Sequence, residues 1–408
     1  MGPACRRALL GAGPAPGTGR DPNGGGAARR AFRRSRNRRP EAAETPEAPA
    51  LRAGCRGLQG VRAGRPRPGN FPAGALFFWR EVRYTRSRSQ KEVFLVEYRV
   101  GIDLGGTNVA VGVVNENKEI VARANVPTRP DRMLDDVIYD IACCVKEAVK
   151  KAGITLQECV LVGIGSPGYC RAADGMVVYA GNLGWKNVPI CDELRQELGV
   201  SVRLSNDANC AALGEVVAGA AKGAKSAVLL TLGTGVGGGV VLNGKVYEGD
   251  VGPGTEMGHT TLILGGEPCT CGQRGCLEAY ASATGLLRQR HRAEQAHPET
   301  TMKRFHPADG SAPFICAAEG DETAKAVVEQ YITYVGAGIV NFVNIFAPEV
   351  VLIGGGVSNA GDALIRPLND YVQANRFGGR RSPTCPVRRA ALGGDAGIIG
   401  AAYLDWEG

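Results

Sequence analysis

From Tyr98 onward, apolar residues recur in patterns that predict alternating strands and helices. Residues 98–126 (YRVGIDLGGTNVAVGVVNENKEIVARANV) predict three strands, separated by a glycine turn and an asparagine-rich turn. Residues 132–152 carry apolar side chains three or four positions apart and stop before Gly153, so they predict a helix. A strand-rich unit followed by a helix is typical of an α/β protein.

The same alternation continues to the end of the chain. Apolar runs predict further strands, helices and hairpins in segments 159–168, 200–221, 226–249, 322–346, 349–358, 361–376 and 387–405. We expect two α/β lobes. The first covers 96–212 together with a C-terminal helix at about 388–408, and the second covers 213–387.

Residues 1–95 lack any sustained period of 2 or 3.6. They are rich in Gly, Ala, Pro and Arg, and such a segment buries too little apolar surface to offset chain entropy. We expect a disordered basic leader. An Arg-rich arm for targeting or anion binding is one alternative. Another is that translation starts near Val96, and we favour an inert or artefactual leader.

The charge is distributed unevenly. Residues 1–95 hold 20 Lys and Arg against 6 Asp and Glu, a net of +14. Since the whole chain carries +8, residues 96–408 carry −6. A mildly acidic folded part does not favour a nucleic-acid surface. The sequence has no run of about 18 apolar residues, the length that would predict a membrane span. We expect a cytoplasmic protein.

Two glycine-rich loops each follow a predicted buried strand. They are DLGGTN, residues 103–108, and LGTGVGGG, residues 232–239. Glycines let main-chain N–H groups approach an anion closely, and Thr107 and Thr234 add hydroxyl donors. Neither loop is a Walker loop or a dinucleotide fingerprint. A third cluster, GGGVS at 354–358, ends a strand and begins a helix, where a nucleotide base or ribose could lie, although plain packing also explains it.

One histidine and three cysteines stand close together, with the spacing H-x9-C-x-C-x4-C. His259, Cys269, Cys271 and Cys276 offer four ligands that suit tetrahedral Zn²⁺ in a closed structural site. Because all four positions are filled by protein, a catalytic zinc-bound water is not expected. Three cysteines in a loop rich in Gly, Thr and Arg are poorly explained by packing alone.

These motifs, with SNDANCAALGE, EMGH and CTCGQRGCLEAYAS, resemble the ROK family in kind and in order. The resemblance covers about 98–405. That family comprises sugar kinases and repressors on a two-lobed, actin-like (hexokinase or ribonuclease-H-like) fold with a central cleft and a zinc loop. The combination is most similar to bacterial ATP-dependent glucokinases, so it implies an enzyme that phosphorylates glucose, or another hexose, at the 6-hydroxyl.

The resemblance also implies roles for individual residues. Position alone favours Asp207 as a helix N-cap, but the matching aspartate of the family is the catalytic base. The implied sugar-binding residues are Asn182, Asn206, Asp207, Glu256, His259 and Glu278. The implied nucleotide-binding residues are Asp103, Gly105, Gly106, Thr107, Asn108, Thr234, Gly235, Gly355 and Gly356.

The zinc loop accounts for the two glutamates beside it. A metal that binds one ring nitrogen of His259 leaves the other nitrogen as a fixed donor, which can face a sugar hydroxyl. Glu256 precedes His259 by three residues, and Glu278 follows Cys276 by two. We therefore expect a structural zinc that positions the sugar site.

Two alternatives stay open. An N-acetylmannosamine or other amino-sugar kinase shares the same catalytic residues. A sugar-responsive ROK repressor would need a winged helix ahead of the fold, and residues 1–95 show no such pattern. The expected cofactors are ATP, Mg²⁺ and structural Zn²⁺. The expected partners are the hexose and ATP, with nucleic acid and membrane disfavoured. The family implies a homodimer or homotetramer.

Overall fold

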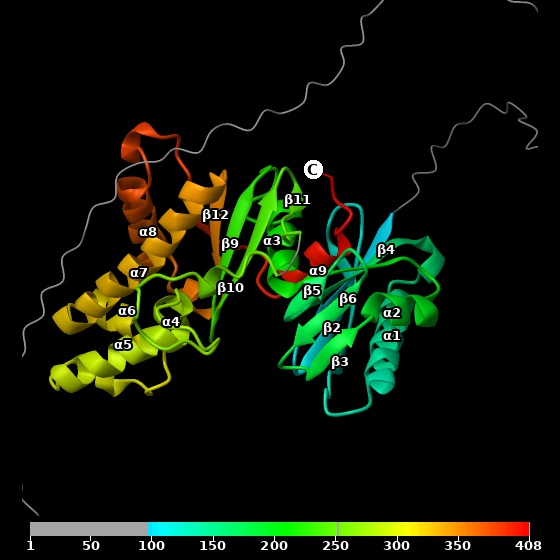
Figure 1. Ribbon diagram of the computed structural model, residues 1–408, viewed down its shortest axis with the longest axis horizontal. Helices are drawn as coiled ribbons and strands as arrows, with labels where there is room; N and C mark the ends of the chain where they lie inside the picture. The colour runs from blue at the N-terminus through cyan, green and yellow to red at the C-terminus, as the bar shows by residue number, and fades with distance from the viewer. Residues whose placement is uncertain (1–96, 251–252, 408) are drawn as a thin grey trace, which may run out of the picture. The chain divides into compact units, whose positions relative to one another are not determined.

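The computed structural model of the chain describes residues 97–250 and 253–407 (Figure 1). The predictions made for residues 1–95, including the disordered leader and the missing winged helix, lie outside the described residues.

The first half of the fold is a five-stranded mixed sheet. Its strand order is β3-β2-β1-β4-β8. Strands β1 and β2 are antiparallel, as are β2 and β3, whereas β4 pairs in parallel with both β1 and β8. The strands are β1 (Tyr98–Leu104), β2 (Asn108–Val114), β3 (Ile120–Pro127), β4 (Cys159–Ser166) and β8 (Val202–Asn206).

A second five-stranded sheet repeats this pattern. Its order is β11-β10-β9-β12-β13, with β10 antiparallel to both β9 and β11, and β12 parallel to both β9 and β13. The strands are β9 (Ala227–Leu232), β10 (Val236–Leu242), β11 (Lys245–Val246), β12 (Val350–Gly354) and β13 (Val387–Arg389). Each sheet opens with a hairpin whose turn is one of the predicted glycine loops.

The remaining elements cover the two sheets. Those of the first half are α1 (Leu134–Lys151), α2 (Ile190–Leu198) and the small antiparallel sheet of β5 (Tyr169–Arg171), β6 (Met176–Ala180) and β7 (Trp185–Val188). Those of the second half are α4 (Glu278–Ala281), α5 (Ala283–Ala296), α6 (Ala312–Ala318), α7 (Glu322–Phe346) and α8 (Asp362–Asn375). Helix α1 begins with acidic residues and ends with Lys150 and Lys151, which suits the helix dipole.

Two helices that are far apart in the sequence pack against each other, α3 (Asp207–Val217) and α9 (Asp395–Ala402). A methyl group added at Gly400 would lie 1.7 Å from the main-chain oxygen of Cys210, and one at Gly214 would lie 2.1 Å from that of Ala396. The two backbones therefore touch, which only glycine permits.

The same two helices contact the two sheets. A Cβ at Gly101 of β1 would lie 1.8 Å from the main-chain oxygen of Ile398, so α9 packs on the first sheet. A Cβ at Gly239 of β10 would lie 2.5 Å from the main-chain oxygen of Ala208, so α3 packs on the second. The order of layers is therefore first sheet, α9, α3, second sheet.

The α/β architecture is confirmed. One buried cluster lies in each half, and a third joins residues of α3 and α9 to the second sheet. The C-terminal helix α9 packs on the first sheet. The expected boundary between residues 212 and 213 falls inside α3, so the exact lobe limits stay a prediction.

Helix α7 is a core helix. It is the one helix among the described residues that is long and apolar enough to cross a membrane, yet half of its most apolar stretch is buried in the protein. Its buried side chains, such as Tyr331, Ile339 and Phe342, belong to the core of the second half. Asp321 caps its start by accepting a hydrogen bond from the N–H of Ala324 at 3.0 Å.

We predict that Gly400→Ala destabilises the protein by about 1–3 kcal/mol, because the added methyl group forces α3 and α9 apart. Gly310→Ala is the matched control, since a Cβ there meets nothing within 4 Å. Urea unfolding of both variants measures the difference. An equal, small effect of the two substitutions would contradict the backbone contact.

Candidate functional site

A cleft of about 960 Å³ collects residues from both sheets and from α3. Strand ends and glycine loops supply most of its wall. Of the residues predicted to form the site, those that line it are Asp103, Asn182, Asp207, Gly235, His259, Glu278 and Gly355. The structure thus brings together residues from six separate sequence motifs.

Asp207 lies at the start of α3, where β8 ends. Its side chain lines the large cleft and also a smaller pocket of about 210 Å³. Burial raises the pKa of this carboxyl group, while hydrogen bonds from the N–H of Ala208 and from Asn206 oppose the rise. Such a carboxylate can accept a proton from a hydroxyl group held in the cleft.

The helix cap is the neighbouring residue. Asn206 Oδ1 accepts hydrogen bonds from the N–H groups of Ala208 at 2.9 Å and Asn209 at 3.3 Å, and Asn206 Nδ2 donates to the main-chain oxygen of Gly168 at 3.2 Å. Asn206 is therefore the N-cap of α3, the role that the sequence position suggested for Asp207. It lines the smaller pocket and not the large cleft.

Asp103 stands at the end of β1, at the same cleft. Burial, and then the negative charge of Asp207, raise the pKa of its carboxyl group to about 6. A divalent cation, which prefers oxygen ligands, would offset the effect of the Asp207 charge on the Asp103 carboxyl group. The donor set therefore fits a metal such as Mg²⁺.

The first glycine loop contributes less directly. Gly105, Gly106, Thr107 and Asn108 are not among the residues that line the cleft. A side chain at Gly106 would be a tight fit, because a Cβ would lie 3.2 Å from Asn182 Nδ2. The loop is tied down by the Thr128 hydroxyl group, which donates to the main-chain oxygen of Gly105 at 2.7 Å.

The second glycine loop, between β9 and β10, lines the cleft through Gly233 and Gly235, while Thr234 is exposed and lies outside the lining. The third cluster also reaches the cleft. Gly355 has a φ of 76°, and a Cβ there would lie 2.5 Å from the main-chain oxygen of Leu232. Glycine is required at this position.

A second cavity of about 790 Å³ adjoins the cleft and shares Thr231, Gly355, Gly393 and Gly394 with it. Gly356 and Arg389 also line it, and Arg389 donates to Asn359 Oδ1 at 2.5 Å. The cavity is large enough for a base and a ribose.

Glu256 lines the smaller pocket. Burial raises the pKa of its carboxyl group, and the charges of Asp207 and Glu278 raise it further, whereas His259 lowers it. The preceding residue, Thr255, has a φ of 63°, which is rare for a β-branched residue. Its hydroxyl group donates to Asn209 Oδ1 at 3.2 Å, which ties the segment to α3.

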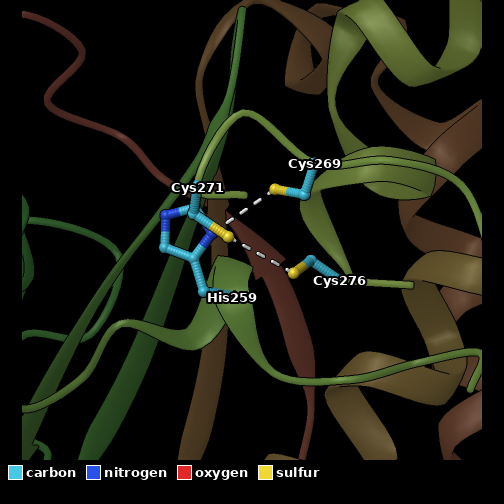
Figure 2. Close-up of side chains that lie close together, drawn as sticks. All are labelled: His259, Cys269, Cys271 and Cys276. Carbon is cyan, nitrogen blue, oxygen red and sulfur yellow. Dashed lines mark hydrogen bonds between the residues drawn. The ribbon is translucent and has the colours of Figure 1, made fainter. Parts of the chain in front are cut away.

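The four residues of the predicted metal site converge in the structure (Figure 2). One ligand atom from each of His259, Cys269, Cys271 and Cys276 lies within 4.8 Å of the others. His259 Nδ1 is 3.6 Å from Cys269 Sγ, and Cys271 Sγ is 3.7 Å from Cys276 Sγ. A tetrahedral zinc with bonds of about 2.3 Å to sulfur and 2.0 Å to nitrogen implies separations of about 3.8 and 3.5 Å, so the residues fit this metal.

The orientation of His259 matters for the cleft. Its Nδ1 faces the cysteines, and the same residue lines the cleft, so Nε2 is the nitrogen left for a ligand there. Glu278 Oε2 accepts from the N–H of Val236 at 3.1 Å, and Glu278 Oε1 accepts from the Thr270 hydroxyl group at 3.0 Å. The metal loop and the second glycine loop thus hold this carboxylate from two sides.

Several lining residues were not foreseen. Gly393 and Gly394, just before α9, line both the cleft and the second cavity. The sequence LGGD before a helix carries the same signal as the other glycine loops. Glu248 lines the smaller pocket and accepts a hydrogen bond from the Ser205 hydroxyl group, and no sequence pattern marked it.

The chain is similar to known proteins over most of its length. The model of the ROK family matches residues 99–407. The chain belongs to the ROK family. It is 37% identical to a glucokinase of Halalkalibacterium halodurans, over 75% of this chain and 94% of that protein. It is 39% identical to a glucokinase of Thermotoga maritima, over 75% of this chain and 96% of that protein.

The fold of the ROK protein matches solved structures. A Streptomyces griseus ROK glucokinase in complex with glucose and AMPPNP has a TM-score of 0.62 at 33% identity, with 75% of this chain and 98% of that chain covered. Other relatives have different activities. They include a xylose repressor of Caldicellulosiruptor bescii at 31% identity, with 73% of this chain and 77% of that protein covered. An N-acetyl-D-glucosamine kinase of Pasteurella multocida is 32% identical, with 75% and 98% covered.

The raised pKa of Asp103 predicts a pH-dependent cost in stability. A carboxyl group whose pKa rises from 3.8 to about 6 on folding favours the folded state below pH 3.8 and loses that contribution as the pH rises through 6. Without nucleotide or metal, Asp103→Asn should therefore be more stable than the wild type at pH 7.5, by about 1–3 kcal/mol. The advantage should shrink towards pH 4.

Thermal unfolding at the two pH values measures this difference. Asp370→Asn, an exposed site on α8, controls for the change in net charge. A stability difference between Asp103→Asn and the wild type that is the same at pH 4 and pH 7.5 would show that folding does not raise the pKa of Asp103.

Proposed function

We propose that this protein is an ATP-dependent hexose kinase that converts glucose to glucose 6-phosphate. The observation that carries the proposal is the position of Asp207. Its carboxylate lies at the helix start where the cleft lined by glycine loops meets the cluster of His259, Glu256 and Glu278. The similarity to glucokinases over most of their length supports the same activity.

The reaction requires a proton acceptor beside the attacking hydroxyl group. Asp207 takes the proton of the sugar 6-hydroxyl as that oxygen attacks the γ-phosphorus of ATP, and the bond to the β-phosphate oxygen breaks to release ADP. Burial raises the pKa of Asp207, which makes it a stronger base than an exposed aspartate. Mg²⁺, held at Asp103, would neutralise phosphate charge when bound.

The sugar is held by groups that both accept and donate. Carboxylates of Glu256 and Glu278 accept from its hydroxyl groups, and His259 Nε2 donates to one. Asn182 lines the cleft from the β6–β7 loop and Asn206 lines the adjoining pocket. The phosphates face the loops that contain Gly105 to Asn108, Thr234 and Gly235, and the base faces Gly355 and Gly356.

The four-residue metal site holds structural zinc in this proposal. All four positions are occupied by protein ligands, so the ion takes no part in the reaction. It fixes the ring of His259 and the loop that precedes Glu278. The zinc loop therefore positions the sugar-binding side chains of the second lobe.

Amino-sugar kinase and repressor activities are the alternatives to a glucokinase. The N-acetyl-D-glucosamine kinase among the relatives makes N-acetylglucosamine an alternative substrate, and N-acetylmannosamine is the alternative that the sequence leaves open. A panel of these sugars and glucose distinguishes them by kcat/KM. A repressor role is disfavoured because the carboxylate and glycine loops of the kinase site are present. Cytoplasmic location, a role in glycolysis and a homodimeric or homotetrameric state stay predictions.

Asp207→Asn tests the base. The amide keeps the oxygen that accepts from the N–H of Ala208 at 2.8 Å, so the fold should be preserved. We expect kcat to fall by about 10²–10⁴, with glucose affinity changed little. ADP release measures kcat, and calorimetry measures affinity. Turnover close to that of the wild type would remove Asp207 from the reaction.

Cys271→Ser tests the metal site at its most exposed ligand. The wild type should contain about one Zn²⁺ per chain, and the variant should contain less. Because His259 serves both metal and sugar, glucose affinity should fall more than ATP affinity. Cys143→Ser, on α1, is the control.

Metal content by mass spectrometry and both affinities by calorimetry are the measurements. Equal losses of glucose and ATP binding in Cys271→Ser would indicate general unfolding. A zinc-free wild type with full activity would contradict the proposed role of the metal.

A further inference from the structure

A buried carboxylate lies beside the proposed nucleotide cavity, and no step of the reaction uses it. Glu215, near the end of α3, has an exposed fraction of 0% and lines the cavity of about 790 Å³. Taking a carboxylate out of water is costly unless its oxygens accept hydrogen bonds. The hydrogen-bond partners of Glu215 therefore indicate its function.

Both oxygens accept from main-chain N–H groups of loops distant from each other in sequence. Oε1 accepts from the N–H of Leu392 at 2.8 Å. Oε2 accepts from the N–H of Ala220, in the turn after α3, at 2.7 Å. Bonds from N–H groups to an ionised acceptor are among the stronger hydrogen bonds in proteins.

Leu392 belongs to the loop that bounds the cavity. This loop, residues 390–394, joins β13 to α9 and contains Gly393 and Gly394, which line both the cavity and the cleft. Gly393 has a φ of 55°, in the left-handed region that glycine adopts easily. Because glycine restricts the backbone little, the loop depends on its hydrogen bonds to keep this conformation.

Few other bonds fix this loop. At its start, the N–H of Ala390 donates to the main-chain oxygen of Ile353 at 2.9 Å. At its end, where α9 begins, the N–H of Asp395 donates to the main-chain oxygen of Leu392 at 3.1 Å, and the N–H of Ala396 donates to that of Gly393 at 3.3 Å. The Glu215 carboxylate therefore supplies the link between the middle of the loop and α3.

The same helix carries the proposed base at its other end. Asp207 begins α3, and Glu215 lies eight residues later, or about 12 Å along the helix axis. Ala211, between them, lines both the cleft and the cavity. One rigid helix therefore sets the position of the base and, through Glu215, that of the glycine loop.

We propose that Glu215 is a positioning residue for nucleotide binding. It holds the 390–394 loop against α3, so that Gly393 and Gly394 are placed for the nucleotide relative to Asp207. Glu215 contacts neither sugar nor reacting phosphate. The inference rests on the proposed kinase function, because it assigns the cavity of Gly355, Gly393 and Gly394 to ATP.

Glu215→Gln tests it with almost no change in shape. One oxygen becomes an NH₂ group, which faces an N–H donor and cannot accept from it, so either Leu392 or Ala220 loses its partner. We expect KM for ATP and Kd for AMPPNP to rise about 5- to 50-fold. KM for glucose, and kcat at saturating ATP, should change less than about twofold.

Glu349→Gln is the matched control. Glu349 also accepts from a main-chain N–H group, that of Lys225 at 3.1 Å, but it is exposed and lines no part of the cavity. Hydrogen exchange adds a second readout. In Glu215→Gln, exchange should accelerate in a peptide covering 390–394 and stay unchanged in one covering 202–212.

Each outcome decides the question. A folded Glu215→Gln protein with unchanged ATP affinity, or with equal losses for ATP and glucose, would overturn the proposal. If that variant does not fold, Glu215→Asp keeps the charge with a shorter reach and must show the same selective loss. If neither variant folds, Glu215 serves the fold alone and the proposal is wrong. The wild-type assay separates the two hypotheses, since absent glucose phosphorylation there would reject the kinase function itself.

Discussion

The direct contact between the backbones of α3 and α9 is the constraint on which the rest of the site depends. Gly214 and Gly400 allow the two helices to touch, and Gly101 and Gly239 bring each helix onto its own sheet. Because α3 begins at the cleft, this packing fixes Asp207 between the hairpin loops of two sheets that share one topology. A side chain at any of these glycines would separate layers whose spacing sets the width of the cleft.

The chemistry of the cleft depends on two buried carboxyl groups whose ionised forms are disfavoured. Asp103 and Asp207 face one cavity, and burial disfavours the ionised form of each. A cation relieves the pair, and the phosphates of a nucleotide bring such a cation with them. On the sugar side, the metal proposed for the Cys/His cluster would orient His259 without contacting the substrate, while the second glycine loop holds Glu278.

Much of this arrangement could be predicted from sequence, because short motifs carry local geometry. The sequence predicted a long helix over about 322–346, which is α7, and the H-x9-C-x-C-x4-C spacing predicted a four-ligand site that the structure brings together. Asn206, and not Asp207, proved to be the helix cap, since adjacent polar residues at a helix start compete for the same N–H groups. The contributions of Glu215, Glu248 and the Gly393–Gly394 loop depend on contacts between distant segments, which no local pattern reveals.

In the proposed reaction, the 6-hydroxyl of glucose takes the γ-phosphoryl group of ATP. The most direct measurement compares glucose with 6-deoxyglucose, which keeps the other hydroxyl groups and lacks the one that reacts. Mass spectrometry of the products, with ADP release, should show glucose 6-phosphate from glucose, whereas 6-deoxyglucose should bind and compete without being phosphorylated. Phosphorylation of 6-deoxyglucose, or no phosphorylation of glucose, would contradict the account.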